Sequence, residues 1–573
     1  MAEQQLPDVR AAMRRAPFSL DDEAVAWVEA TLAGLSDEDK VGQLFCGIAL
    51  QTDAEELDRT LAVCRPGGVM FRPGSVEGAV GYANLLAERL PIPPLVAANL
   101  ERGGNGIVAE GTSLGSPLAV AATDDVATAA RLGEICGREG AAVGANWAFA
   151  PIIDIDTNFR NPITNVRTFG SDAARVRDMG AAYVRAVPAH GVAASIKHFP
   201  GDGQDERDQH LVTSVNDLST DEWDATYGQA YAASIEAGAL TVMIGHIMQP
   251  AYSRALRPGI ADADILPASL APELMDDLLR GRLGFNGLVV TDATTMAGFT
   301  IPMPRSRAVP TAIAAGADVF LFTRNLEEDF GFMLAGVADG TITPGRLDCA
   351  VARVLGLKAA LGLHRPRPAL TVEGARAAVG TEEHRAWSRE TADRAITLVK
   401  EEPGVLPVTP ERYRRVLYCP IEADAGVAYG VRAGACEAVH QMLVDEGFEV
   451  DVFVPKNTFE GAVERTSNYV GVYDLIVYVA NLATKSNQTS VRIEWAQPMG
   501  ANCPHYLASI PTVFVSIENP YHLLDVPRVK TYINTYSSTD NSLQALVDKL
   551  VGRSPFTGTS PVDAFCGRWD TRL

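Results

Sequence analysis

Eight short apolar runs, separated by stretches with helical periodicity, dominate residues 40–325. The runs lie at residues 44–49, 67–71, 95–99, 147–154, 194–199, 241–246, 287–292 and 317–322. Several are apolar throughout rather than at alternate positions, which is typical of parallel strands buried on both faces. Eight such strands with helices between them, over about 300 residues, predict an α/β fold that begins with a (β/α)8 barrel. An open doubly wound sheet is the alternative, but no glycine fingerprint follows any run.

One connection carries clear helix signals at both ends. In residues 269–284, apolar residues recur at spacings of three and four, Ser269 is in place to cap the helix, and Gly284 can terminate it. The sequence therefore predicts a helix over this stretch.

The 573 residues exceed what one hydrophobic core usually holds, so we expect two domains. Two prolines interrupt the helical pattern in "HRPRPAL" (364–370), and the helical stretch "EEHRAWSRETADRAITLVK" follows. Alternation of strands and helices then resumes, with five strands expected. We predict a barrel domain at residues 20–365, a linker and connecting helix at 366–395, and a smaller α/β domain at 396–573. Asn481 and Asn519, at strand ends of that domain, are expected to support loops.

Charge and cysteine usage exclude several function classes. The net charge of −22 is spread along the chain, which argues against nucleic acid or an anionic membrane as a partner. No apolar stretch reads as a signal sequence or a membrane span. The eight scattered cysteines form no C-x-x-C pair, so we expect a reduced, cytoplasmic protein without a zinc framework. A homodimer is left open.

Polar residues stand at the ends of several predicted strands, where a barrel enzyme places its active site. Asp292 directly follows "GLVV" and is the clearest candidate, because a carboxylate there can attack an electrophile, bind a metal or orient a sugar hydroxyl. Asp154 can instead bind loop amides, and His246 is expected to be a buried structural histidine. The full set is Asn99, Glu101, Asp154, Asp156, Lys197, His198, His246 and Asp292.

The stretch "KHFPGDGQDERDQH" (197–210) follows the fifth run and contains a second candidate group. Asp208 and His210 are two residues apart, and an aspartate bound to one imidazole nitrogen fixes the tautomer of the other. His210 would then be a general acid and base. A charged surface turn is an equally good interpretation of these residues alone. A metal site is weaker, since Lys197 would lie among the ligands.

The same stretch resembles the signature of the β-N-acetylglucosaminidase branch of glycoside hydrolase family 3. Residues 266–299 resemble that family's nucleophile segment, and "NWAFAPIIDIDTNFRNPITNVRTFG" (146–170) and "NLERGG" (99–104) are similar to two further blocks. The resemblance covers residues 40–360 in order. The second domain resembles, more loosely, the α/β sandwich of two-domain members.

The resemblance implies a retaining glycosidase without a cofactor. Asp292 would be the nucleophile and His210, paired with Asp208, the acid/base. Arg167, Lys197 and His198 match positions that bind the hydroxyls of the terminal sugar, and Asn99 and Glu101 belong to the substrate-binding set. The sequence departs from the family pattern at Asn99, usually Asp, at Asp202, usually His or Leu, and at Gln209, usually a small residue.

We therefore expect an exo-acting β-N-acetylglucosaminidase that acts on an amino-sugar glycoside. A dual β-glucosidase/β-N-acetylglucosaminidase and a glycoside phosphorylase are the alternatives among enzymes, since a neutral histidine, unlike a carboxylate, does not repel phosphate as the acceptor. A non-catalytic sugar-binding barrel is the alternative of another class. The presence of nucleophile, acid/base and dyad partner disfavours it.

Overall fold

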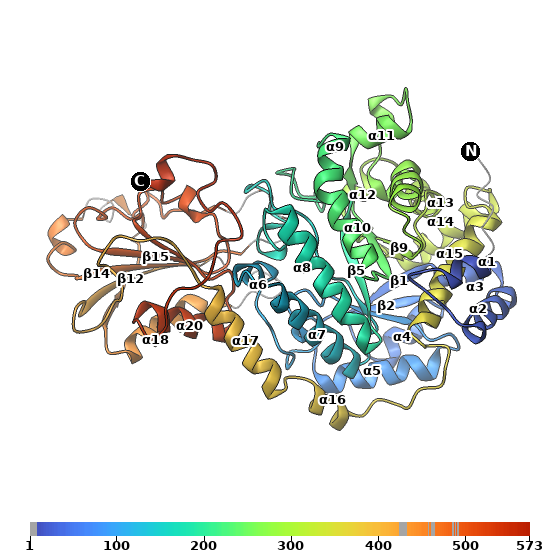
Figure 1. Cartoon of the computed structure of the whole chain (residues 1–573), viewed down its shortest axis with the longest axis horizontal. Helices are drawn as coiled ribbons and strands as arrows, with labels where there is room; N and C mark the ends of the chain where they lie inside the picture. Colours follow the sequence, from blue (N-terminus) through green and yellow to red (C-terminus); the bar gives the residue numbers. More distant parts are fainter. Residues whose placement is uncertain are drawn as a thin grey trace. The chain divides into compact units, whose positions relative to one another are not determined.

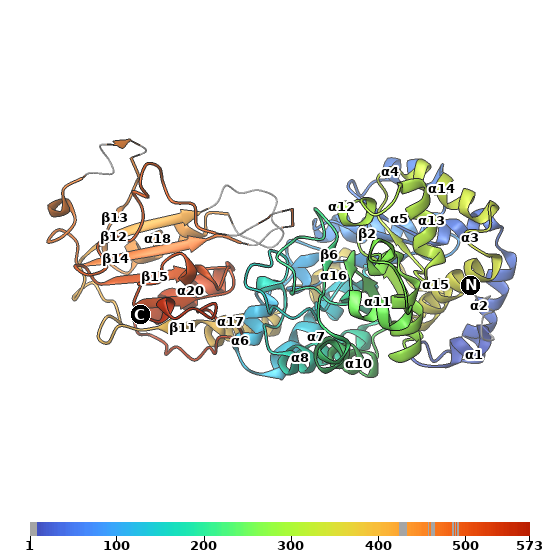
Figure 2. The same ribbon diagram turned by 90° about the horizontal axis from the view of Figure 1, so that it is seen from above.

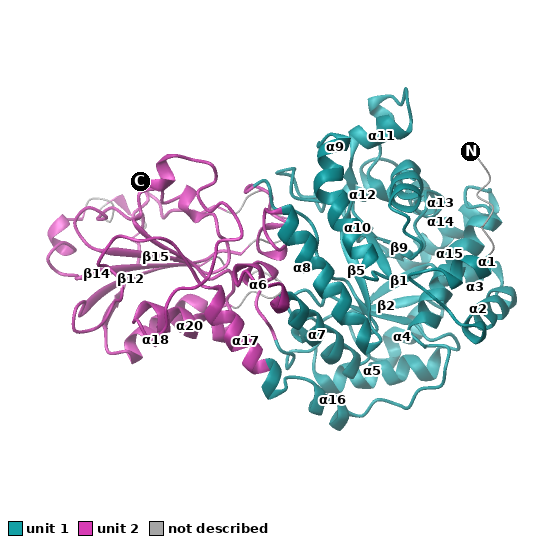
Figure 3. Ribbon diagram, viewed as in Figure 1, with its two compact units in different colours: residues 1–112, 129–158, 173–384 teal, residues 113–128, 159–172, 385–573 magenta. Residues whose placement is uncertain are grey.

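The computed structural model describes residues 9–422, 433–456, 458–459, 464–483, 486–487, 489 and 492–573. The chain divides into two compact units, shown in two colours in Figure 3. The first unit contains residues 1–112, 129–158 and 173–384, and the second contains residues 113–128, 159–172 and 385–573. The division after residue 384 falls inside the stretch predicted as a connection. The domain limits at 365 and 396 stay a prediction.

The first unit contains a sheet of eight parallel strands, and each predicted run overlaps one of them. Neighbours follow the order β10-β1-β2-β3-β4-β5-β7-β9, and a parallel bridge between Val290 and Val319 joins the two ends. The predicted (β/α)8 barrel is thereby confirmed. The strands are β1 (Phe45–Ala49), β2 (Gly68–Phe71), β3 (Leu95–Ala98), β4 (Trp147–Ala148), β5 (Ala193–Phe199), β7 (Thr241–Ile244), β9 (Leu288–Thr291) and β10 (Phe320–Leu321).

Helices surround these strands, as Figures 1 and 2 show from two directions. They bury the outer face of the sheet while the strands' inner side chains fill the barrel, so all seven residues of β5 are buried. The helices are α1 (Val9–Arg14), α2 (Asp22–Gly34), α3 (Asp37–Gln43), α4 (Ala54–Leu61), α5 (Val76–Arg89), α7 (Val126–Ala142), α8 (Ala173–Ala186), α9 (Thr220–Trp223), η4 (Asp224–Gly228), α10 (Gln229–Glu236), α11 (Pro250–Leu256), η7 (Glu273–Arg282), α12 (Ala297–Thr300), α13 (Arg305–Ala314), α14 (Leu326–Ala338), α15 (Pro344–Ala360) and α16 (Val372–Ala378).

The helix expected from Ser269 begins later than predicted. A short turn, η6 (Ala268–Leu270), comes first, and η7 starts at Glu273 after Pro272. Ser269 is fully buried and its hydroxyl binds His246 instead of capping the helix, so the predicted cap is wrong. Gly284 does lie just after the helix with φ +70°, a conformation that suits glycine at a helix end.

The second unit contains a six-stranded sheet in the order β11-β16-β15-β14-β12-β13. Five of its strands were predicted: β12 (Arg415–Glu422), β13 (Glu449–Val452), β14 (Leu475–Asn481), β15 (Thr512–Ser516) and β16 (Thr531–Asn534). The sixth, β11 (Thr397–Lys400), pairs antiparallel with β16. Treating residues 382–400 as one helical stretch was therefore wrong at its end, because α17 (Glu382–Ala395) stops just before this strand.

Each face of this sheet has its own apolar cluster, because successive strand residues point to opposite sides. On β12, Val416 and Tyr418 belong to the cluster that includes α18 (Ala435–Asp445) and α20 (Asp540–Leu550). Leu417 and Cys419 belong to the opposite cluster, which is covered by segments outside the strands, at residues 493–510 and 523–529. Helix α6 (Pro117–Ala122) also belongs to this unit. The smaller α/β sandwich is thereby confirmed.

Two of its strand ends carry the asparagines expected to support loops. Asn481 donates a hydrogen bond to Glu422, and Asn519 accepts one from the backbone N–H of Tyr521.

Among the helices of the described residues, none combines the length and apolar character needed to cross a membrane.

Candidate active site

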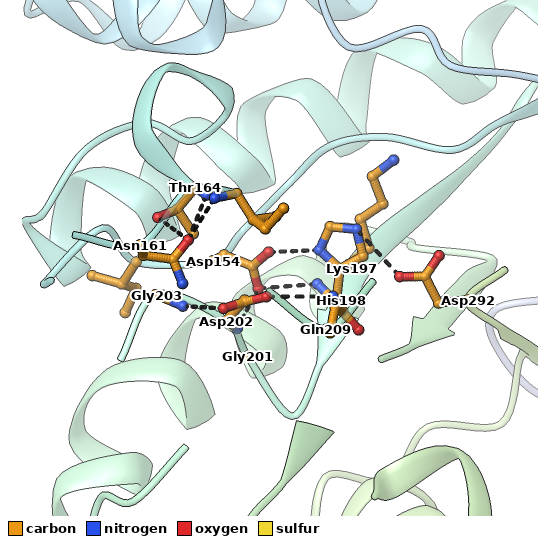
Figure 4. A network of polar contacts seen from close by, with 12 residues as sticks. Asp154, Asn161, Thr164, Lys197, His198, Gly201, Asp202, Gly203, Gln209 and Asp292 are labelled. Atoms are coloured by element: carbon orange, nitrogen blue, oxygen red, sulfur yellow. Dashed lines mark hydrogen bonds and ion pairs between the residues drawn. The ribbon is translucent and has the colours of Figure 1, made fainter. Parts of the chain in front are cut away.

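Several of the predicted site residues lie at the carboxyl ends of barrel strands. Lys197 and His198 are near the end of β5, and Asp292 directly follows β9. Since parallel strands end at one edge of a barrel, these side chains share the edge where barrel enzymes bind their substrates. Figure 4 shows them together with a network of polar contacts in which His198 lies between Asp154 and Asp292.

The ammonium group of Lys197 is paired with a carboxylate from another strand. Its Nζ lies 2.7 Å from Oε1 of Glu101, which follows β3, and the two side chains are only 4% and 13% exposed. A buried cation is tolerated where an opposite charge compensates it. Two of the predicted substrate-binding residues are thus in direct contact.

His198 is held by Asp154, which lies in the segment after β4, the strand next to β5. One carboxylate oxygen of Asp154 accepts from the backbone N–H of His198 at 3.0 Å, and the other lies 2.7 Å from the ring Nδ1. This contact places the ring proton on Nδ1 and orients Nε2 toward Asp292, whose Oδ2 is 3.8 Å away. The expectation that Asp154 binds loop amides is confirmed, since Asp202 N also donates to it. Its contact with the His198 ring was not foreseen.

Asp292 is fixed by its backbone and kept ionised by its neighbours. Its N–H donates to the carbonyl of Ile244 at 2.7 Å, and its Oδ1 accepts from the N–H of Ala293 at 2.7 Å. Burial by itself raises the pKa of this carboxyl, but the neighbouring imidazoles, His198 first, lower it, and the net pKa lies below the ordinary value. At neutral pH the group is therefore a carboxylate, the form that can act as a nucleophile.

Asp208 and His210 form the predicted dyad. Oδ1 of Asp208 lies 2.7 Å from the backbone N of His210 and 2.7 Å from its ring Nδ1. The carboxylate is fully buried, whereas the imidazole is 23% exposed. The carboxylate accepts the Nδ1 proton, so Nε2 remains to exchange a proton with a bound molecule. A charged surface turn does not describe a pair whose carboxylate is fully buried.

The loop that carries the dyad is attached to the segment after Asp292. The carbonyl of His210 accepts from the N–H of Ala297 at 3.0 Å, and the hydroxyl of Thr213 donates to the carbonyl of Gly298 at 3.1 Å. Strand β6 (Ser214–Val215) then pairs with β8 (Ile247–Met248). The segment after Asp292 and the segment of the dyad therefore share hydrogen bonds, although they are more than 80 residues apart in the sequence.

His246, at the end of β7, is a buried structural histidine, as expected. Its Nδ1 lies 2.9 Å from the hydroxyl of Ser269, and its Nε2 lies 3.1 Å from the carbonyl of Ala293. Burial lowers its pKa from 6.5 to about 4, even though Asp292 pulls it upward. The ring is neutral at neutral pH and supports the loop that follows Asp292.

The two remaining predicted substrate-binding residues are Asn99 and Arg167. Asn99 directly follows β3 and is half-buried. Arg167 lies in η2 (Asn165–Arg167), in a segment that belongs to the second unit. Their sugar-binding roles stay predictions from the resemblance.

Comparisons with known proteins cover nearly the whole chain. The family model described as "Glycosyl hydrolase family 3 N terminal domain" matches residues 37–357. A "Beta-N-acetylglucosaminidase/beta-glucosidase" from Cellulomonas fimi is 56% identical over 97% of this chain and 99% of its own length.

Two solved structures are similar along almost their full length. "Beta-glucoside phosphorylase BglX" superposes with a TM-score of 0.92 at 44% identity, covering 98% of this chain and 100% of that one. A family 3 β-N-acetylglucosaminidase from Paenibacillus sp. str. FPU-7 superposes with a TM-score of 0.78 at 24% identity, covering 93% and 100%. The latter similarity concerns the fold alone. The chain, with its two-unit architecture and matched barrel, belongs to glycoside hydrolase family 3.

Proposed function

We propose that the protein is a retaining, exo-acting β-N-acetylglucosaminidase that works through a covalent glycosyl-aspartate. The observation that carries the proposal is the ionised Asp292 at the strand ends of the barrel, with His198 Nε2 3.8 Å from it. The 56% identical relative, named for activity on β-N-acetylglucosaminides and β-glucosides, supports this substrate class. Action on both sugars is the alternative within the same mechanism.

In the first step, Asp292 attacks the anomeric carbon and the bond to the leaving oxygen breaks. That oxygen takes the proton from Nε2 of His210, whose cation is stabilised by Asp208 at 2.7 Å. In the second step, His210 removes a proton from water as the water displaces Asp292. Two inversions at one carbon give net retention.

Lys197, Glu101 and His198 would hold the terminal sugar. The Lys197–Glu101 pair offers both a donor and an acceptor to sugar hydroxyls while remaining compensated itself. Asn99 stands where the family pattern has a carboxylate, and its amide both donates and accepts, so it is a candidate to adjust sugar preference.

Hydrolysis of aryl β-N-acetylglucosaminides and aryl β-glucosides by wild type and Asp292→Ala tests the proposal. The wild type should release the aryl group and the variant should lose all measurable turnover. If the wild type cleaves no aryl β-glycoside, the non-catalytic sugar-binding barrel gains support. If Asp292→Ala retains activity, the nucleophile is another residue.

Phosphate is a second candidate acceptor. A neutral imidazole at position 210 does not repel an anion as a carboxylate would, and the 44% identical structure is named a β-glucoside phosphorylase. An oxygen of phosphate would displace Asp292 and yield a sugar 1-phosphate. Turnover with phosphate should exceed turnover with sulfate at equal ionic strength. Equal rates and no sugar phosphate would limit the enzyme to water as the acceptor.

A homodimer and a cytoplasmic location stay predictions.

A further inference from the structure

The two positions where the dyad loop departs from its family pattern contact each other. Nε2 of Gln209 donates to Oδ2 of Asp202 at 3.3 Å, and both side chains are buried, at 0% and 2% exposure. The side chain of a small residue at position 209 has no amide group, so it cannot make this contact. The departures at Asp202 and Gln209 are therefore one structural feature rather than two unrelated changes.

Asp202 joins the beginning of the loop to the support of His198. Its backbone N–H donates to Oδ1 of Asp154 at 2.8 Å, and Asp154 in turn holds the His198 ring. Its carbonyl accepts from the hydroxyl of Tyr227, in η4, at 2.6 Å. Its own carboxylate accepts from the N–H of Gly203 at 2.7 Å. Asp202 is thus fixed from three sides.

Gln209 lies between the two dyad residues and reaches a different strand. Its Oε1 accepts from the backbone N–H of His246, at the end of β7, at 2.8 Å. Its main chain is closely packed as well, because a Cβ added to Gly298 would lie 2.4 Å from the Gln209 carbonyl oxygen. Its side-chain amide therefore connects the start of the loop with the barrel, immediately beside His210.

We propose that Asp202 and Gln209 act as a clamp. Their side-chain contact positions His210 to transfer a proton to the leaving oxygen while Asp292 attacks the anomeric carbon. Both are positioning residues, and the inference rests on the proposed acid/base role of His210. The clamp links the support of His198 to the dyad through Asp154, Asp202 and Gln209, part of the network drawn in Figure 4. A displacement of about 1 Å in a reacting group can cost roughly 100-fold in rate, so a side-chain bridge at this place has a large effect on catalysis.

Gln209→Ala tests the clamp, and Gln249→Ala is its matched control. Gln249 is also fully buried, donates to the carbonyl of Leu218 at 2.7 Å and accepts from the N–H of Tyr252 at 2.7 Å. Both variants remove one buried glutamine with two hydrogen bonds, but only one of them adjoins the dyad. A common loss of stability therefore cancels in the comparison.

The double variant Asp202→Leu, Gln209→Ser is the second test. It replaces the pair by residue types of the family pattern and leaves neither partner of the 3.3 Å bond behind. It keeps the inference testable if Gln209→Ala is poorly folded. We expect a melting temperature closer to wild type than that of Gln209→Ala, while the clamp remains absent.

The leaving-group dependence of kcat/KM is the deciding readout. Gln209→Ala and the double variant should lose about 10-fold more activity on aryl glycosides with poor leaving groups than on activated ones, because only the former need protonation. Gln249→Ala should lose the same factor on both. Equal losses in the Gln209→Ala series, or wild-type leaving-group dependence in the double variant, would overturn the clamp.

Hydrogen exchange separates failure of the clamp from failure of the proposed function. Peptides spanning residues 203–213 should exchange faster in Gln209→Ala than in wild type, and unchanged exchange would overturn the clamp without reference to activity. His210→Ala assayed on the same substrates tests the acid/base role alone. Faster exchange together with no leaving-group effect in His210→Ala would overturn the proposed role of His210, and with it the catalytic part of this inference.

Discussion

Asp154→Asn should damage catalysis while leaving the fold largely intact. The Asp154 carboxylate divides its bonds: Oδ1 accepts from the backbone N–H groups of His198 and Asp202 at 3.0 and 2.8 Å, and Oδ2 binds the His198 ring at 2.7 Å. An asparagine oxygen can still serve the two backbone donors. Its NH2 group then faces the protonated Nδ1 of His198, so two donors meet and the ring must change its tautomer or turn.

The size of the effect follows from the bond that is lost. A hydrogen bond to a charged group contributes about 1.5–3 kcal/mol. Each ~1.36 kcal/mol of activation free energy changes the rate tenfold. If His198 acts at the sugar beside Asp292, kcat/KM should therefore fall roughly 10- to 150-fold. Asp154→Ala should in addition lower stability by about 2–5 kcal/mol, because it leaves two buried N–H groups without their acceptor.

Steady-state kinetics on an aryl β-N-acetylglucosaminide, combined with thermal unfolding, checks this prediction. Asp154→Asn should keep a melting temperature near wild type with the stated loss of kcat/KM, whereas Asp154→Ala should lose both. A kcat/KM within twofold of wild type for Asp154→Asn would refute the claim that the carboxylate orients His198 for catalysis.

Three further variants probe the remaining groups. His210→Ala should slow substrates with poor leaving groups roughly 100-fold or more while activated ones suffer much less, and equal losses in a leaving-group series would argue against an acid role. His246 has its pKa lowered to about 4, so the unfolded chain binds more protons than the folded one between pH 4 and 6.5 and stability rises with pH in that window. Denaturant unfolding at pH 4.5 and 7 should show a smaller pH dependence for His246→Gln, and an unchanged one would contradict the assignment. Lys197→Met should raise KM and lower stability by about 3 kcal/mol, since Glu101 loses its 2.7 Å partner; calorimetry showing unchanged stability would count against a buried pair.

The barrel was predictable because its strands are marked by local sequence. A strand buried on both faces must be apolar along its length, and each of the eight runs overlaps a strand of the sheet. Strand β11 was missed because residues 397–400 follow α17 almost without interruption and carry no turn signal. Its pairing with β16, more than 130 residues later, is visible only in the fold.

The site was predictable where its groups are neighbours in sequence. Asp208 and His210 are two residues apart, so their hydrogen bond could be anticipated. Asp154 and His198 are 44 residues apart and meet only because β4 and β5 are adjacent strands. The position of Ser269 predicted a helix cap, but its hydroxyl binds the buried imidazole of His246, at the end of a strand.

Trapping the glycosyl-enzyme tests the central claim most directly. A 2-fluoro glycoside with an activated leaving group should react once with the enzyme. The good leaving group keeps formation of the glycosyl-enzyme fast, whereas the fluorine slows the release of the sugar from the enzyme. Intact mass should rise by one sugar, and proteolysis should place the adduct on Asp292, with product from ordinary substrate retaining the β configuration by NMR. An adduct on any other residue, or turnover that inverts the anomeric carbon, would contradict the account.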